Sequence, residues 1–146
     1  QDLTRIGLSV DQRDALLKKY SPSDAVAFLK APILHPECRS ALKNNSIVKR
    51  DDLNFKDQNQ VGVALCAFGE AISDFLKPSI QQTLEPEARA AVMKVNEGAR
   101  ILADLFYRLF LSCRSQIKPA LSLFAKNTAD SIPADNFFSV LLSEKN

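Results

Sequence analysis

The side chains that could do chemistry in this sequence are few and widely spaced. The single histidine, His35, lies between Pro32 and Pro36. No carboxylate or second histidine stands at a spacing that would make it a general base or a metal ligand, so we interpret it as a capping or surface residue. No nucleophile–base pair or ligand cluster occurs elsewhere. The sequence therefore predicts no catalytic residue, no metal site and no cofactor, and an enzyme is the least favoured class.

The three cysteines, Cys38, Cys66 and Cys113, are odd in number and have no paired spacing. This argues against a disulfide framework or a zinc site and favours an intracellular protein, either cytoplasmic or nuclear. Cys66 and Cys113 lie within apolar stripes, where a cysteine usually acts as a small buried hydrophobe. No run approaches the roughly 18 apolar residues that a membrane span needs, and Asp2 and Arg5 are inconsistent with a signal peptide.

The glycines follow no phosphate-loop pattern. Three of them fall inside predicted helices, where we interpret them as points of close helix–helix approach. They are Gly62, Gly69 and Gly98.

The elements that would position these side chains are all predicted to be helical. The 146 residues are 46% apolar and 25% charged, which is typical of one globular domain that buries its own core. Proline and capping residues divide the chain into blocks with helical periodicity. We therefore predict a single all-α domain over 1–146, with three short helices in 1–45, a long helical hairpin in 46–126 and a tail in 127–146.

The three short helices have recognisable starts. Ser9 and Gln12 form a capping box, with the Ser9 hydroxyl accepting from the Gln12 amide and the Gln12 side chain reaching back. A second helix is predicted to start at Ser21–Pro22, with serine as the cap and proline in the first turn. A third begins at Pro36. Helices this short must pack on a larger body.

That larger body is a pair of long amphipathic helices. Apolar residues recur at three- to four-residue spacing over Ser46–Lys77 and again over Pro86–Lys118. A short connection between Pro78 and Pro86 predicts an antiparallel hairpin on which the short helices pack. The period is nearer 3.6 than 3.5, which favours a bundle over a simple two-stranded coiled coil.

The apolar stripe of the second long helix is broader than one facing helix can cover. Either the short helices or a second copy of the chain must bury it. We predict a homodimer, in which the helices self-associate through a set of apolar side chains. The set is Leu65, Phe68, Ile72, Val95, Leu102, Leu105, Phe106 and Leu109.

The charge is unevenly distributed along the chain. Residues 85–126 carry seven basic and four acidic groups, a net charge of +3, whereas the whole chain has +2. A basic helix face can hold phosphate backbones without sequence preference, so non-specific nucleic-acid binding is an alternative function. A solvated face is the simpler interpretation, since acidic residues interrupt the run. The candidate nucleic-acid residues are Arg100, Arg108, Arg114 and Lys118.

Several short strings, taken in order, resemble a known family. They are Gly7-Leu8, Leu16-Leu17-Lys18-Lys19-Tyr20, Leu29-Lys30-Ala31-Pro32, Leu34-His35-Pro36-Glu37, Lys49-Arg50-Asp51, Gln58-Asn59-Gln60, Glu97-Gly98-Ala99-Arg100-Ile101-Leu102-Ala103-Asp104-Leu105, Arg114-Ser115-Gln116-Ile117-Lys118-Pro119 and Leu142-Ser143-Glu144-Lys145. Their order resembles the Gag-like first-reading-frame proteins of tyrosine-recombinase retrotransposons of the DIRS and Ngaro type. It is more distantly similar to the carboxy-terminal domain of the alpha isoform of lamina-associated polypeptide two.

The resemblance implies a structural, non-enzymatic protein encoded by a retroelement, or a domesticated copy of one. The lamina relative has long antiparallel helices that dimerise. The expected function is therefore a self-association module of a Gag-like protein. The alternative is a host interaction domain that binds a chromatin or nuclear-lamina partner, through a groove or through the apolar segment 137–142. Neither alternative involves a membrane or a small-molecule substrate.

Overall fold

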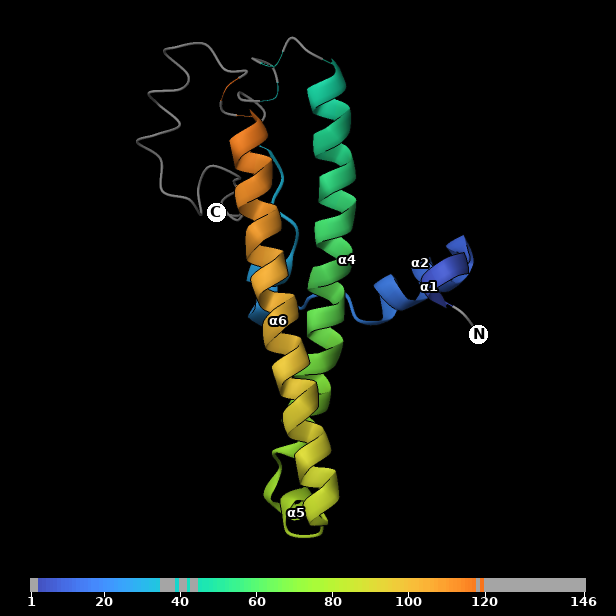
Figure 1. Ribbon diagram of the computed structural model, residues 1–146, viewed down its shortest axis with the longest axis vertical. Helices are drawn as coiled ribbons and strands as arrows, with labels where there is room; N and C mark the ends of the chain where they lie inside the picture. The colour runs from blue at the N-terminus through green and yellow to red at the C-terminus, as the bar shows by residue number, and fades with distance from the viewer. Residues whose placement is uncertain (1–2, 35–38, 40–41, 43–44, 118, 120–146) are drawn as a thin grey trace. The chain divides into compact units, whose positions relative to one another are not determined.

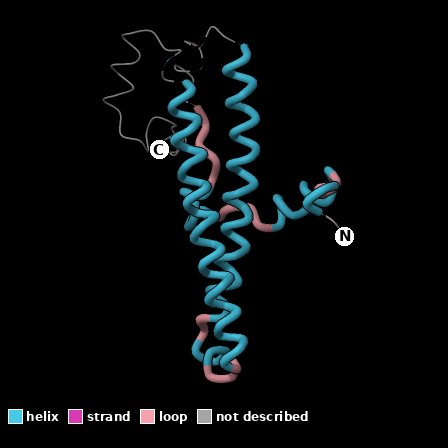
Figure 2. Tube along the Cα trace, viewed as in Figure 1, coloured by secondary structure: helices cyan, strands magenta, loops and turns pink. Residues whose placement is uncertain are grey.

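The computed structural model describes residues 3–34, 39, 42, 45–117 and 119. Within these residues every regular element is a helix, and turns and loops connect the helices (Figure 2). The predicted all-α class is confirmed. The predicted third short helix at Pro36, the continuation of the hairpin to Lys126 and the tail over 127–146 lie outside the described residues, apart from Arg39, Leu42 and Pro119.

The two long helices are α4, Asn45–Phe75, and α6, Pro86–Ile117. Their ends lie within two residues of the predicted ones. The predicted connection contains a further short helix, α5, Pro78–Gln81. Pro78 occupies the first position of α5, and Lys77 before it has an extended ψ of 131°. Proline disfavours helical geometry in the preceding residue, so α4 stops and a new helix starts.

Among the described residues, α1, α2 and a 3₁₀ helix precede the long pair. The first, α1, Leu3–Ile6, was not predicted; it ends at Gly7, whose φ is +74° and whose amide donates to the Leu3 carbonyl at 2.9 Å. The second, α2, spans Val10–Lys19 and has the predicted capping box. The Gln12 amide donates to Ser9 Oγ and the Ser9 amide donates to Gln12 Oε1, both at 3.3 Å.

The helix predicted to start at Ser21–Pro22 differs from the prediction. It is a 3₁₀ helix, η1, Asp24–Leu29, and Ser23 takes the cap position without a side-chain hydrogen bond. Val26 inside it has a non-helical backbone, with φ −121° and ψ 32°. Pro22 precedes the helix rather than opening it. A six-residue helix forms at most a few hydrogen bonds, so packing decides its form.

The chain divides into two compact units, one with residues 1–30 and 60–103 and one with residues 31–59 and 104–146. Both long helices contribute to both units. Within each unit a stretch of α4 therefore lies beside an antiparallel stretch of α6 (Figure 1). The shorter elements α1, α2, η1 and α5 all belong to the first unit. The assignment of 1–146 to a single domain stays a prediction, as does the dimer.

The best-covered side chains lie in the second unit. Ile117 of α6 is 1% exposed, and Gln58 of α4 is 2% exposed. The other buried residues of this unit are Ala31, Leu34, Leu42 and Cys113. In the first unit the buried large apolar side chains of the described residues come from one stretch of α4, at Val63, Leu65 and Cys66.

Candidate self-association surface

In the first unit, the apolar stripe of α6 is not buried. The buried residues of α6 are Cys113 and Ile117, and both belong to the second unit. Between Pro86 and Ala103 every residue of α6 stays at least partly exposed. Val95 and Leu102 lie two turns apart on one side of the helix. Val95 is 40% exposed, and Leu102 is half-buried. The facing stretch of α4 therefore covers this stripe incompletely.

The apolar side of α4 in the first unit is also incompletely covered. Phe68 and Phe75 are separated by seven residues, so they lie on one side of α4. Each remains 39% exposed. Cys66 lies on the other side of α4 and is buried in the first unit. The helix pair of the first unit thus leaves large apolar side chains of both helices in contact with water.

The predicted self-association residues fall into three groups by burial. Leu65 is buried. Phe68, Val95 and Leu105 are exposed. Half-buried are Ile72, Leu102, Phe106 and Leu109. Leu65 therefore belongs to the core of the single chain, whereas the other side chains retain accessible apolar area.

In the second unit a polar residue lies inside the helix pair. The Gln58 Nε2 donates to the backbone carbonyl oxygen of Phe106, at 3.3 Å. No buried side-chain nitrogen or oxygen of the described residues lacks a partner. The prediction did not include Gln58, because a glutamine within an apolar stripe is indistinguishable by spacing from one on a solvated face.

The start of α4 carries a charged cluster in the second unit. Arg39 pairs with Asp52, with Nη2 at 3.2 Å from Oδ1 and 3.4 Å from Oδ2. Burial raises the pKa of the neighbouring Asp51 carboxyl; the charge of Asp52 adds to this effect, and Arg39 opposes it. Neither aspartate lies in the first turn of α4, which begins at residue 45.

Cys66 and Cys113 are free and buried, as the sequence predicts for small hydrophobes, and Cys38 lies outside the described residues. Burial raises the pKa of the Cys66 thiol, and the charge of Glu70 raises it further. Burial also raises the pKa of Cys113, with Asp51 adding to the effect and a hydrogen bond from Asn54 opposing it. In both thiols burial therefore disfavours the thiolate, which is the nucleophilic form.

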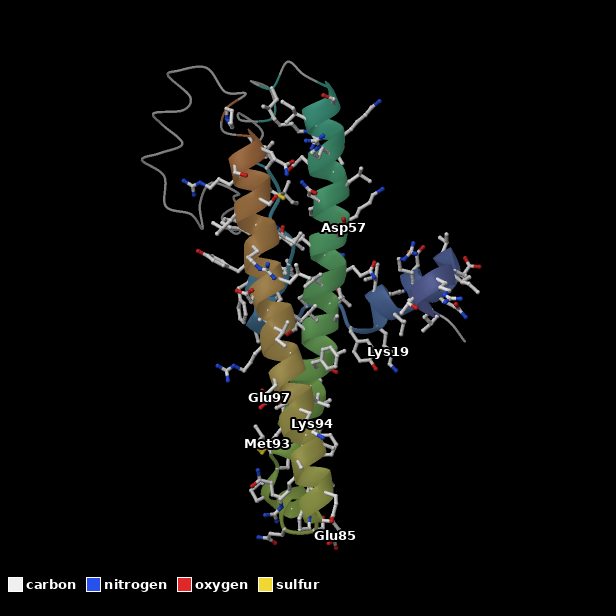
Figure 3. All side chains as sticks on the ribbon, in the orientation of Figure 1. Lys19, Asp57, Glu85, Met93, Lys94 and Glu97 are labelled. Atoms are coloured by element: carbon white, nitrogen blue, oxygen red, sulfur yellow. The ribbon has the colours of Figure 1, made fainter. Side chains whose placement is uncertain are left out.

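Three of the four candidate nucleic-acid residues lie on the described part of α6, and their role stays a prediction. Arg108 Nε lies 2.9 Å from Asp104 Oδ2, so an acidic neighbour offsets its charge. Arg100 is exposed and Arg114 half-buried, while Lys118 lies outside the described residues. Lys94 and Glu97, also on α6, further mix the signs along this helix (Figure 3).

The interpretation of the helical glycines is wrong for two of them. A Cβ built on Gly69 or Gly98 would meet no atom within 4 Å. Neither glycine therefore marks a close approach of another segment. The space next to the Cα atom of each glycine is instead open.

At the α5 turn of the first unit, a cavity of about 450 Å³ opens between the ends of α4 and α6. Phe75, Val92 and Met93 contribute apolar walls. Met93 is labelled in Figure 3. Arg89 closes one side, donating from Nη2 to the Gln81 carbonyl at 2.8 Å and from Nε to the Leu84 carbonyl at 3.2 Å. Arg89 thus stabilises the turn by binding carbonyl oxygens that precede α6.

No group of three or more histidine, cysteine or acidic side chains in the described residues is arranged as a metal site. No helix in that part of the chain is long and apolar enough to cross a membrane.

A family model described as Domain of unknown function (DUF8747) matches residues 1–138. The chain belongs to this family. The DUF8747 match includes every helix described above, so the incompletely covered helix pair lies inside the family's domain. The comparisons with curated proteins and with solved structures found no match.

Proposed function

We propose that this chain is a non-catalytic module that self-associates through the helix pair of its first unit. One observation carries the proposal: no residue of α6 between Pro86 and Ala103 is buried, although the apolar side chains there recur at helical spacing. Exposed apolar stripes of this kind are unfavourable in water and mark interaction surfaces.

A second copy is the occupant that this surface fits. Two helices form a single layer, and a stable helical domain needs at least one more layer on the apolar side. In a two-fold dimer the same stripe of each copy covers the other, and two helix pairs form a four-helix bundle. Phe68 and Val95 are then anchors of the interface, because large apolar side chains contribute most when water is excluded around them.

The test compares oligomeric state across concentration. We expect light scattering to give the dimer mass at tens of micromolar and a lower mass on dilution, as for ordinary micromolar affinities. Phe68→Glu and Val95→Glu should each shift the equilibrium to monomer, because a charge would be placed in the dry interface. Both positions are partly exposed in the single chain, so we expect the helical circular-dichroism signal to be retained.

The matched control is Leu53→Glu. Leu53 is also a large apolar residue of α4, but it is 61% exposed and belongs to the second unit. This variant should dimerise like the unmodified chain. The proposal is contradicted if the unmodified chain remains monomeric up to about 100 µM, because this range covers micromolar dimer affinities. Dissociation by Leu53→Glu to the same extent would contradict the assignment of the interface.

The resemblance to Gag-like proteins supports a finer form of this proposal, in which self-association serves the multimerisation of a retroelement protein. Genomic neighbours test this form. A reverse-transcriptase frame and a recombinase frame beside the coding sequence would support it. An isolated, intron-bearing locus would contradict it and favour a domesticated host interaction domain. Fold agreement alone does not distinguish these functions.

A further inference from the structure

The cavity at the α5 turn combines apolar walls with one arginine. The end of α4, the short α5 and the start of α6 surround it, and all three belong to the first unit. Its volume of about 450 Å³ is in the range of pockets that hold small organic ligands. The apolar walls come from Phe75, Leu76, Leu84, Val92 and Met93.

These apolar walls are in contact with water. Phe75 is 39% exposed, Leu76 is 59% exposed and Met93 is 64% exposed. Several large apolar side chains around one cavity form a surface that is unfavourable in water. A ligand with an apolar chain would remove part of this surface from water.

The charge of the cavity comes from Arg89. Its Nη2 donates to the Gln81 carbonyl oxygen at 2.8 Å, and its Nε donates to the Leu84 carbonyl oxygen at 3.2 Å. A guanidinium has five N–H donors, so three remain, and neutral carbonyl oxygens do not cancel its positive charge. Arg89 forms no ion pair with any residue that the structure describes. It is therefore a fixed cation with spare donors.

No described carboxylate lines the cavity. The acidic residues nearest to Arg89 in the sequence are Glu85 and Glu87, and neither belongs to the lining. Figure 3 shows Glu85 at the end of the turn and Met93 farther along α6. A lining with one cation and no anion complements a ligand that carries an anionic group. Arginine binds carboxylates through charge-assisted hydrogen bonds, which are often bidentate.

We propose that the cavity at the α5 turn binds a small anionic amphiphile, namely a carboxylate on an apolar chain, as in a medium-chain fatty acid. The carboxylate pairs with Arg89, and the chain covers the apolar walls. This inference goes beyond the proposed self-association and does not depend on it, because the interface anchors Phe68 and Val95 do not line the cavity.

The test titrates the isotope-labelled full chain with decanoate, below its micelle concentration, and follows the Met93 methyl and Arg89 Nε–H resonances by NMR. We expect both resonances to shift saturably, with a dissociation constant of about 0.1–1 mM, as for a small ligand in an open pocket. Decylammonium has the same chain and the opposite charge. It should bind at least about tenfold more weakly, because it cannot accept hydrogen bonds from Arg89 and is repelled by its charge.

Comparing the two ligands leaves the protein unchanged, which is necessary because Arg89 also stabilises the turn. Met93→Asp then tests the position of the site. It should weaken decanoate binding at least about tenfold, since it places a like charge at the cavity wall. The matched control is Ile101→Asp, because Ile101 is also an exposed apolar residue of α6 in the first unit, at 71%, but does not line the cavity. This variant should bind decanoate like the unmodified chain.

Three results would overturn the inference. Equal binding of decanoate and decylammonium would show adsorption to apolar surface without a role for Arg89. Equal weakening by Met93→Asp and Ile101→Asp would place the binding site elsewhere. Absence of saturable shifts up to about 10 mM decanoate would exclude the ligand class. In that last case, sedimentation of the chain with vesicles of phosphatidylcholine and phosphatidylglycerol would assign the apolar surface to a membrane instead.

Light scattering on the same samples separates this inference from the proposed function. A dimer that does not bind decanoate would overturn the ligand site and leave self-association intact. A chain that binds decanoate and is monomeric at every concentration would overturn self-association and leave the ligand site intact.

Discussion

Gln58 and Phe106 are joined across the two long helices by a hydrogen bond of 3.3 Å between the glutamine Nε2 and the phenylalanine carbonyl oxygen. Gln58 is 2% exposed, so its amide is satisfied inside the helix pair of the second unit. A buried polar side chain with a single suitable partner disfavours other registers, since sliding one helix past the other would leave the amide unpaired. We infer that this bond contributes to the register of α4 against α6.

Gln58 variants separate the hydrogen bond from packing. Gln58→Leu keeps most of the volume and leaves the Phe106 carbonyl its bond within α6, so the free energy of unfolding should change by about 1 kcal/mol or less. Gln58→Ala opens a cavity and should cost about 2–4 kcal/mol. Urea unfolding followed by circular dichroism measures both. Equal losses in the two variants would show that the hydrogen bond, and not packing, dominates.

Asp51→Asn should stabilise the protein at neutral pH. Burial and Asp52 raise the pKa of Asp51 in the folded state, so the folded chain holds this proton more tightly than the unfolded chain. The free energy of unfolding then falls as the pH rises from the pKa of Asp51 in the unfolded chain, about 3.9, through its higher pKa in the folded chain. The gain from Asp51→Asn should therefore be present at pH 7 and absent near pH 3. It should be about 1 kcal/mol at most, because the carboxyl is partly exposed.

Asp52→Asn is the control for this experiment. It removes the ion pair with Arg39, so it should lower or leave unchanged the free energy of unfolding at pH 7. Urea titrations of both variants at several pH values make the comparison. A loss of stability in Asp51→Asn at pH 7 would contradict the assigned direction of the pKa change.

Ser9→Ala should destabilise α2 by about 1 kcal/mol, because the Gln12 amide loses its cap. Since no residue of α2 is buried, the loss should appear as faster local amide exchange in α2 rather than as a lower global midpoint. Ser23→Ala is the matched control, since Ser23 caps η1 without a side-chain hydrogen bond. Equal effects of the two substitutions would contradict a specific role of the capping box.

Arg89→Ala should destabilise the turn before α6. The guanidinium donates to the carbonyl oxygens of Gln81 and Leu84, and its removal should cost about 1–2 kcal/mol. Arg100→Ala, on an exposed part of the same helix, should change stability by no more than about 0.5 kcal/mol. Thermal unfolding compares the two. If Arg89→Ala left the unfolding temperature unchanged, this would show that water replaces the arginine at these carbonyl oxygens.

Local sequence determined α2 and the two long helices with their ends, whereas packing decided the form of η1. Ser9 and Gln12 are three residues apart, so their capping box forms within one turn and needs no other part of the chain. Pro86 opens α6 for the same reason, because its backbone restriction acts on its immediate neighbours. The short α5 was missed, since a four-residue helix leaves no periodic signal.

Only the tertiary structure decided how well each face is covered. Periodicity places Val95 and Cys113 on apolar stripes of one helix, yet the first is 40% exposed and the second 5%. The difference arises from segments distant in the sequence, because burial is the sum of what packs on a residue from everywhere in the fold. The same reason makes Gln58 a core residue and leaves Gly69 beneath open space. Sequence spacing specified which residues share a face, and tertiary packing determined which of those faces remain available to a second molecule.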